Sequence, residues 1–166
     1  MPYDAQPTSA AAILTVPPAA TMNPDRETTA LVDDELDVLA ELVPIAGRDI
    51  IELGCGAAGL ARSLLARHPD SRVNGLEVDE RQHAKNLASP QRGLHFVAAP
   101  AQAIPFPDAS FDVALMLKSL HHVPLPLLAP ALGEVARVLR PRGHLYVSEP
   151  VYGGPLNEIV RLFNDE

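Results

Sequence analysis

The segment 49–65, with the sequence DIIELGCGAAGLARSLL, contains glycines with the spacing G-x-G-x-x-G, at Gly54, Gly56 and Gly59. Where a strand is followed by a helix, glycine lets the backbone approach a ligand, and the helix N-terminus presents N–H groups to a phosphate or a carboxylate. Glu77 follows 18 positions after Gly59, at the end of the next expected strand, where it can accept hydrogen bonds from both ribose hydroxyls. These residues predict a site for an adenosine-bearing cofactor and leave a nicotinamide or flavin oxidoreductase open.

Glu52 narrows the choice of ligand, because it lies two residues before Gly54 in the expected strand. A carboxylate at this point repels a pyrophosphate and attracts an ammonium group. An amphipathic helix is also expected before the glycine-bearing strand, whereas a nicotinamide-binding domain commonly begins with that strand. The preceding helix disfavours a nicotinamide-binding domain, and Glu52 favours a ligand with a positively charged amino-acid end.

The elements that must position these groups follow from the spacing of apolar residues. A first helix is expected from about Glu27 to Pro44. Strands are then expected over 49–53, 71–78, 94–98, 111–117 and 143–149, and helices over 58–67, 80–88, 126–139 and 155–164. Strands separated by helices predict a doubly wound, Rossmann-like α/β fold with a mainly parallel sheet and helices on both faces. Ligands of such sheets bind beyond the carboxyl ends of the strands, where the strand order reverses.

Length and composition restrict the class of protein. The chain has 166 residues and a net charge of -8, which fits one domain and disfavours binding to nucleic acid. Residues 1–24 contain scattered prolines and are expected to form a flexible tail, which leaves 25–166 for the domain. No apolar run reaches the length of a membrane span, and Cys55 is the single cysteine, so we expect a cytoplasmic protein with a small-molecule substrate.

Three further blocks follow ELGCGAAG in a fixed order: AIPFPDASFDVAL, LHHV and EVARVLRPRGHLYVSEP. With these blocks the sequence resembles the class I S-adenosylmethionine-dependent methyltransferases, in particular the small-molecule group that includes quinone C-methyltransferases. The resemblance implies methyl transfer from S-adenosylmethionine to a small organic acceptor. A nicotinamide-dependent oxidoreductase and a cofactor-binding protein without activity are the alternatives.

The resemblance also implies which residues meet the cofactor. The backbone of Gly54, Cys55 and Gly56 would line the methionine part, with Glu52 near its amino group. Glu77 would hold the ribose and Val78 would pack on the adenine, and Leu117 is assigned to the same site. Relatives usually carry an adenine-binding Asp where this chain has Pro100, which has neither an acceptor side chain nor an N–H group. Adenine recognition is therefore expected from the backbone around Ala101, from Gln102, or from water.

A second departure from the resembled family lies at the end of the chain. Members continue after the fifth strand through another helix and a hairpin of two strands, whereas this sequence ends at EIVRLFNDE. We expect a chain truncated at its C-terminus, in preference to an edge covered by a partner or an inactive protein. The strand 143–149 would then be an exposed edge and would promote self-association.

The candidate catalytic residues follow the fourth and fifth strands. A sulfonium methyl group is already activated, so a base is needed only when the acceptor carries a proton of high pKa. His121 and His122 follow the fourth strand, and one of them is a candidate for that base; otherwise they pack the following loop. Glu149 ends the fifth strand before Pro150 and is a candidate to contact the acceptor. These three residues lack the tight spacing of a structural zinc site, and no metal is expected.

Overall fold

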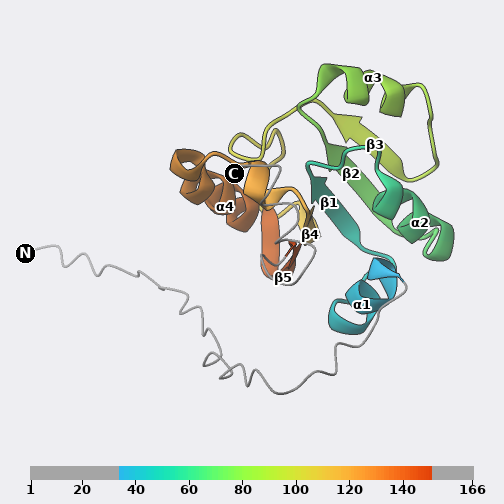
Figure 1. Cartoon of the computed structure of the whole chain (residues 1–166). Coiled ribbons are helices and arrows are strands. Elements are labelled where there is room, and N and C mark those ends of the chain that lie inside the picture. Colours follow the sequence, from blue (N-terminus) through green and yellow to red (C-terminus); the bar gives the residue numbers. More distant parts are fainter. Residues whose placement is uncertain (1–33, 151–166) are drawn as a thin grey trace, which may run out of the picture. The chain divides into compact units, whose positions relative to one another are not determined.

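In the computed structural model the described residues are 34–150 (Figure 1). Five strands form one sheet: β1 (Asp49–Leu53), β2 (Arg72–Leu76), β3 (Leu94–Val97), β4 (Phe111–Leu117) and β5 (Leu139–Ser148). Their order is β3-β2-β1-β4-β5, and every neighbouring pair is parallel. The order reverses between β1 and β4, which confirms the doubly wound fold. The expected tail, the beginning of the first helix and the helix at 155–164 lie outside the described residues.

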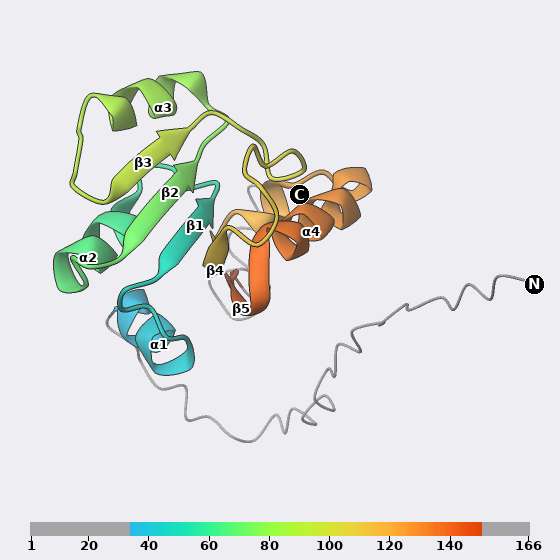
Figure 2. The same cartoon turned by 180° about the vertical axis from the view of Figure 1, so that it is seen from behind.

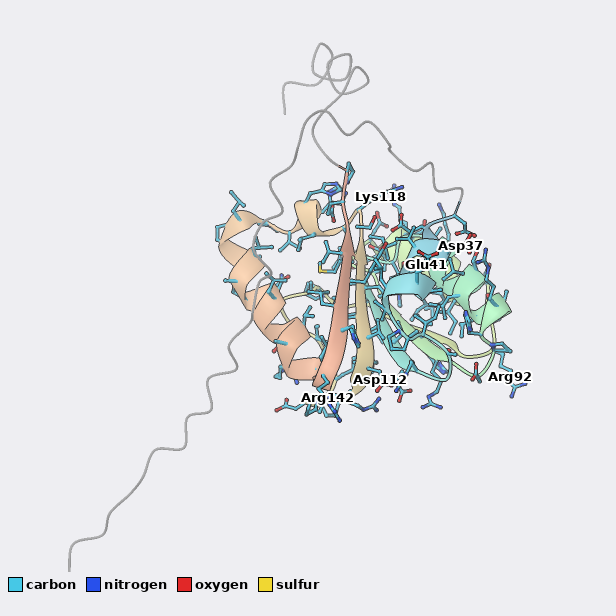
Figure 3. All side chains as sticks on the ribbon, turned by 90° about the horizontal axis from the view of Figure 1, so that it is seen from below. Asp37, Glu41, Arg92, Asp112, Lys118 and Arg142 are labelled. Atoms are coloured by element: carbon cyan, nitrogen blue, oxygen red, sulfur yellow. The ribbon has the colours of Figure 1, made fainter. Side chains whose placement is uncertain are left out.

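The helices cover both faces of this sheet. They are α1 (Glu35–Leu42), α2 (Gly59–Arg67), α3 (Glu80–Leu87) and α4 (Leu125–Val138), with a short 3-10 turn, η1 (Leu120–His122), after β4. Figure 3 shows α4 on one side of β4 and β5, with α1 and α2 on the other. Among residues 34–150, no helix combines the length and the apolar character that crossing a membrane requires.

The alternation of side chains along β1 divides the core into two clusters. Ile50 packs with Leu36 of α1 and Leu64 of α2, whereas Ile51 packs with Val135 of α4. Successive side chains of a strand point to opposite faces, so Glu52 shares the face of Ile50. The sequence therefore directs one carboxylate into the apolar layer beneath α1 and α2.

Strand β5 begins earlier than the sequence predicts, at Leu139 rather than at residue 143. Leu139 pairs with Phe111, and the register then shifts before His144 pairs with Val113. Arg142 adopts a left-handed φ of 66° within this irregularity. The sequence LRPRG has the composition of a turn, so the pairing ahead of the bulge could not be predicted from it.

Ion pairs join the strands at the end opposite the glycine turn. Asp49 pairs with Arg72 at 2.6 Å and with Arg140 at 3.0 Å. Asp112 accepts the backbone N–H of Asp49 at 3.0 Å and pairs with Arg140 at 2.8 Å. Asp108 of the same turn pairs with Arg137 of α4 at 2.8 Å. These contacts fix the base of the sheet and leave its carboxyl end for ligands.

Candidate functional site

The glycine turn after β1 is shaped by its close contact with the end of β4. Gly54 has a φ of 68° and Gly56 a φ of 50°, values that favour glycine. A Cβ atom on Gly54 would lie 2.8 Å from the Cβ of Ser119. The hydroxyl of Ser119 donates to the carbonyl of Leu53 at 2.8 Å. The site is thus built at the reversal point between β1 and β4.

Glu77 ties the glycine turn to the end of β2. One carboxylate oxygen accepts the N–H of Gly56 at 2.8 Å, and the other accepts the N–H of Asp79 at 2.8 Å. Each carboxylate oxygen keeps a further acceptor position. The geometry is compatible with the predicted contact of Glu77 with two ribose hydroxyls.

Asn86 of α3 supports the same turn and was missed by the sequence analysis. It is buried, and its amide donates to the carbonyl of Gly56 at 2.7 Å. Its side-chain oxygen accepts from Gln82 at 2.9 Å, one helical turn earlier. A polar residue on a largely polar helix gives no warning that it points inward, so the sequence offers only a weak signal for this role.

Cys55 lies buried in the turn and packs against β2. A Cβ atom on Gly75 would lie 2.9 Å from the sulfur of Cys55. Burial, followed by the charges of Glu52 and Glu77, raises the pKa of the Cys55 thiol to about 12. The thiol is therefore protonated at neutral pH and acts as a small packing group rather than a nucleophile.

Glu52 borders a cavity of about 340 Å³ beneath the first turn of α1. Its residue is 5% exposed, and its Oε2 has no hydrogen-bond partner within the described part of the chain. Burial raises the pKa of Glu52 to about 7, against a smaller opposing effect of the Ala61 N–H group. Leu117 and Lys118 line the same cavity. An unpartnered buried carboxylate is a favourable place for an ammonium group.

A second cavity, of about 200 Å³, lies beyond the ends of β1, β2 and β4. Val78, Ala101 and Gln102, the residues predicted to lie near the adenine, line it together. Val78 is 65% exposed and provides an apolar surface on which a planar ring can pack. Leu117, assigned to the same cofactor, lies in the Glu52 cavity and not in this one.

A third cavity, of about 740 Å³, adjoins the second one through His122, Val123 and Pro124, which line both. The structure brings the expected catalytic residues together here: Nδ1 of His121 lies 2.5 Å from a carboxylate oxygen of Glu149. The rings of His121 and His122 have centroids 4.0 Å apart.

Glu149 also caps the turn η1. Its other oxygen accepts the N–H groups of Ser119 at 2.9 Å and Leu120 at 2.7 Å. Burial acts to raise the pKa of Glu149, but the hydrogen bonds from His121, Leu120 and Ser119 outweigh it and lower that pKa. Within residues 34–150, no three His, Cys, Asp or Glu side chains gather as a metal centre would require.

The strand order, the glycine turn, the buried acidic residue at the end of β2 and the adjoining cavities together define a doubly wound cofactor-binding protein. Residues 51–147 match the family model described as a methyltransferase domain. The chain belongs to the class I S-adenosylmethionine-dependent methyltransferases, which confirms the resemblance found in the sequence.

Relatives of this chain include enzymes named for different acceptor atoms. The chain is 34% identical to the O-methyltransferase cnsE of Penicillium expansum, over 78% of this chain and 49% of that protein. It is 35% identical to the 24-methylenesterol C-methyltransferase 2 of Oryza sativa subsp. japonica, over 74% of this chain and 34% of that protein. The chain thus spans less than half the length of these two curated relatives.

A solved structure supports the same fold. The S-adenosylmethionine dependent methyltransferase from Mesorhizobium loti is 31% identical, with a TM-score of 0.60, over 69% of this chain and 53% of that one.

Replacing Glu77 by Ala is expected to weaken cofactor binding by about 1.5 to 3 kcal/mol, the range for hydrogen bonds to a charged group. The carboxylate anchors the Gly56 N–H as well as the expected ribose contact, so both are lost together. Calorimetric titration with S-adenosylhomocysteine measures the effect, and the exposed Glu80 of α3, changed to Ala, is the matched control. An unchanged affinity in Glu77→Ala would exclude a ribose site at the end of β2.

Proposed function

We propose that this protein transfers a methyl group from S-adenosylmethionine to a small organic acceptor. The observation that carries the proposal is that His122 borders two cavities, one lined by Gly54, Val78, Ala101 and Gln102 and the other by His121 and Glu149. An acceptor in the larger cavity would lie next to a ligand in the smaller one, since His122, Val123 and Pro124 border both cavities. Family membership supports the same conclusion.

The residues present fit the cofactor. The unpartnered Glu52 carboxylate suits its ammonium group, Glu77 its ribose, and the exposed face of Val78 its adenine. When bound, the cofactor supplies a methyl group on a positively charged sulfur, which a nucleophile displaces in line. The protein's part is to align the two molecules and to exclude water.

The third cavity favours an acceptor that is largely apolar and carries one ionisable proton. Leu120, Val123, Leu125 and Leu128 supply most of its apolar lining. His121 is the proposed base, because Glu149 holds its Nδ1 and leaves Nε2 for the acceptor. Glu149 stabilises the imidazolium that results, and His122 borders both the cavity that holds the base and the cofactor cavity.

Titration of the purified protein with S-adenosylhomocysteine and with NAD tests the proposal. Binding of S-adenosylhomocysteine without binding of NAD supports the proposal. Binding of NAD without binding of S-adenosylhomocysteine would favour the nicotinamide-dependent oxidoreductase instead. A screen of apolar hydroxyl and enolisable compounds with labelled S-adenosylmethionine then tests for transfer. Cofactor binding with no methylated product in any class would favour a binding protein without activity.

The proposal also covers the kind of partner, the location in the cell and the bounds of the domain. A net charge of -8 supports a partner that is a small molecule rather than nucleic acid. A single cysteine, which cannot form an internal disulfide, suits a cytoplasmic protein. We assign the methyltransferase domain to 25–166.

We also propose self-association through β5, which lies at one border of the sheet formed by residues 34–150. Leu145 is 38% exposed and Val147 is 40% exposed, so this border offers apolar side chains beside backbone groups that can pair. Sedimentation is expected to show a concentration-dependent dimer, and Val147→Lys is expected to shift it to monomer. A monomer at every concentration would contradict the proposal.

A further inference from the structure

The segment that joins β3 to β4 forms one wall of the second cavity. Ala99, Pro100, Ala101 and Gln102 lie in that wall, and the segment runs beside α4 in both views (Figures 1 and 2). Two backbone hydrogen bonds link residues of the segment to each other, from Ala103 to Pro100 at 3.1 Å and from Phe106 to Ile104 at 2.8 Å. Its shape therefore depends on contacts with other elements.

Two side chains of α4 hold the backbone of this segment. Oε2 of Glu134 accepts the N–H of Ile104 at 3.0 Å, while Arg137 donates to the carbonyl of Ile104 at 2.9 Å. Arg137 also donates to the carbonyl of Phe106 at 2.8 Å. Both polar backbone groups of Ile104 are thus bound by one pair of side chains, which we call the α4 clamp (Glu134 and Arg137).

The clamp is rigid because its members bind each other as well. Arg137 meets both oxygens of Glu134, at 2.7 and 2.8 Å, and also pairs with Asp108 at 2.8 Å. All five N–H groups of the guanidinium thereby have an acceptor. The hydrogen bond from Arg137, followed by that from Ile104, lowers the pKa of Glu134 to about 2, so the pair stays charged at every ordinary pH.

The buried side chain of Ile104 carries this restraint toward the cavity. It packs in the same cluster as Ala99 of the wall and Met116, which lines the cavity from β4. Pro100 offers neither an N–H group nor an acceptor side chain. The backbone of this wall, beside the side chain of Gln102, is therefore available to recognise a ring in the cavity, and backbone discriminates between ligands only when it is held in place.

We propose that Glu134 and Arg137 are positioning residues that hold the 99–104 backbone so that it recognises the amino-substituted edge of the adenine ring. The inference rests on the proposed function, since it concerns the same cofactor. Neither residue lines the second cavity: Glu134 acts through Ile104, and Arg137 acts through Ile104 and Phe106.

The test compares S-adenosylhomocysteine with S-inosylhomocysteine, which carries an oxo group in place of the adenine amino group. Calorimetry gives both dissociation constants for the unmodified protein, Glu134→Gln and Arg137→Lys. The unmodified protein is expected to prefer the adenine ligand about fivefold to tenfold, the value of one hydrogen bond, and both variants are expected to lose most of that preference. Arg67→Lys is the matched control, because Arg67 also pairs with two carboxylates, Asp34 and Asp37, but on α1.

The ratio of the two constants separates positioning from general destabilisation. Equal weakening of both ligands, with an unchanged ratio, would overturn the proposal, as would an absence of preference in the unmodified protein. Failure of the unmodified protein to bind S-adenosylhomocysteine would instead overturn the proposed function. If both clamp variants fail to fold, Asp108→Ala removes a single acceptor of Arg137 and is expected to reduce the preference partially; an unchanged ratio there would equally overturn the inference.

Discussion

Replacing Glu52 by Gln is expected to raise the melting temperature of the ligand-free protein at pH 8 and, at the same time, to weaken its binding of S-adenosylmethionine. The two effects share one cause. Glu52 is buried with an unpartnered oxygen, so its charge is costly in the folded protein until a cation is bound. The variant keeps the shape of the side chain and removes the charge.

The pH dependence follows from the raised pKa of Glu52, which burial moves from its ordinary value of 4.5 to about 7. Below pH 4.5 the carboxyl is protonated in the folded and unfolded chains, and its contribution to stability is fully present. As the pH rises through 4.5 to 7, the unfolded chain loses its proton first, and that contribution is lost. Above pH 7 the free energy of unfolding is lower than below pH 4.5 by about 3 kcal/mol from this group, since a change of one in the pKa corresponds to about 1.4 kcal/mol.

Thermal unfolding at pH 5 and pH 8 measures this effect in the absence of ligand. The melting temperature of Glu52→Gln is expected to exceed that of the unmodified protein by several degrees at pH 8 and to match it more closely at pH 5. Glu41→Gln, on the exposed side of α1 (Figure 3), is the control and should change neither value. Equal melting temperatures at both pH values would show that Glu52 is not the buried charge described here.

Cofactor affinity is expected to change in the opposite direction. In the unmodified protein, binding of a ligand with an ammonium group should strengthen as the pH rises from 6 to 8, because Glu52 becomes charged over that range. In Glu52→Gln the affinity should be at least about tenfold weaker at pH 8, and its pH dependence should be reduced. Calorimetric titration with S-adenosylhomocysteine at pH 6 and pH 8 gives the dissociation constants of the unmodified protein and of Glu52→Gln.

Removal of the proposed base gives the other large effect: His121→Ala is expected to lower kcat about 10²-fold to 10⁴-fold for an acceptor with a proton of high pKa. Glu149→Gln should give a smaller loss, because the amide can still cap η1 but no longer stabilises an imidazolium. His122→Ala should chiefly raise the KM of the acceptor, since His122 lies where the two cavities join.

Initial rates with the acceptor found by screening, measured beside the dissociation constant of S-adenosylhomocysteine, separate these roles. The cofactor constant should remain within about twofold in His121→Ala, since that residue does not line the cofactor cavity. If His121→Ala retains full activity and His122→Ala loses it, the two histidines have been assigned in the wrong order.

The fold was predictable because its signals are local. Runs such as DIIEL and FDVALML match β1 and β4 at both ends, since each is apolar on both faces and bounded by turn residues. The ordered blocks around Gly54 and His121 then indicated the site. The beginning of β5 could not be predicted, because it depends on the pairing of Leu139 with Phe111 across a bulge.

The parts of the site that escaped prediction depend on contacts between distant elements. Asn86 supports Gly56 across 30 positions, and Glu134 holds Ile104 across the same separation. Neither residue differs in type from an ordinary polar residue of a helix surface. Leu117 lies in the Glu52 cavity, whereas Val78 lies in the second cavity, and the sequence did not distinguish the two places.

Ser119 is bonded to both halves of the site: its hydroxyl reaches the carbonyl of Leu53 beside the glycine turn, and its N–H reaches Glu149. A movement of η1 caused by an acceptor would thus be transmitted to the turn that receives the cofactor. Two ligands linked through one residue in this way share a coupling free energy, and that coupling is reciprocal. If the cofactor raises the affinity for the acceptor by some factor, the acceptor raises the affinity for the cofactor by the same factor. Coupling of that kind favours the ternary complex over either binary complex.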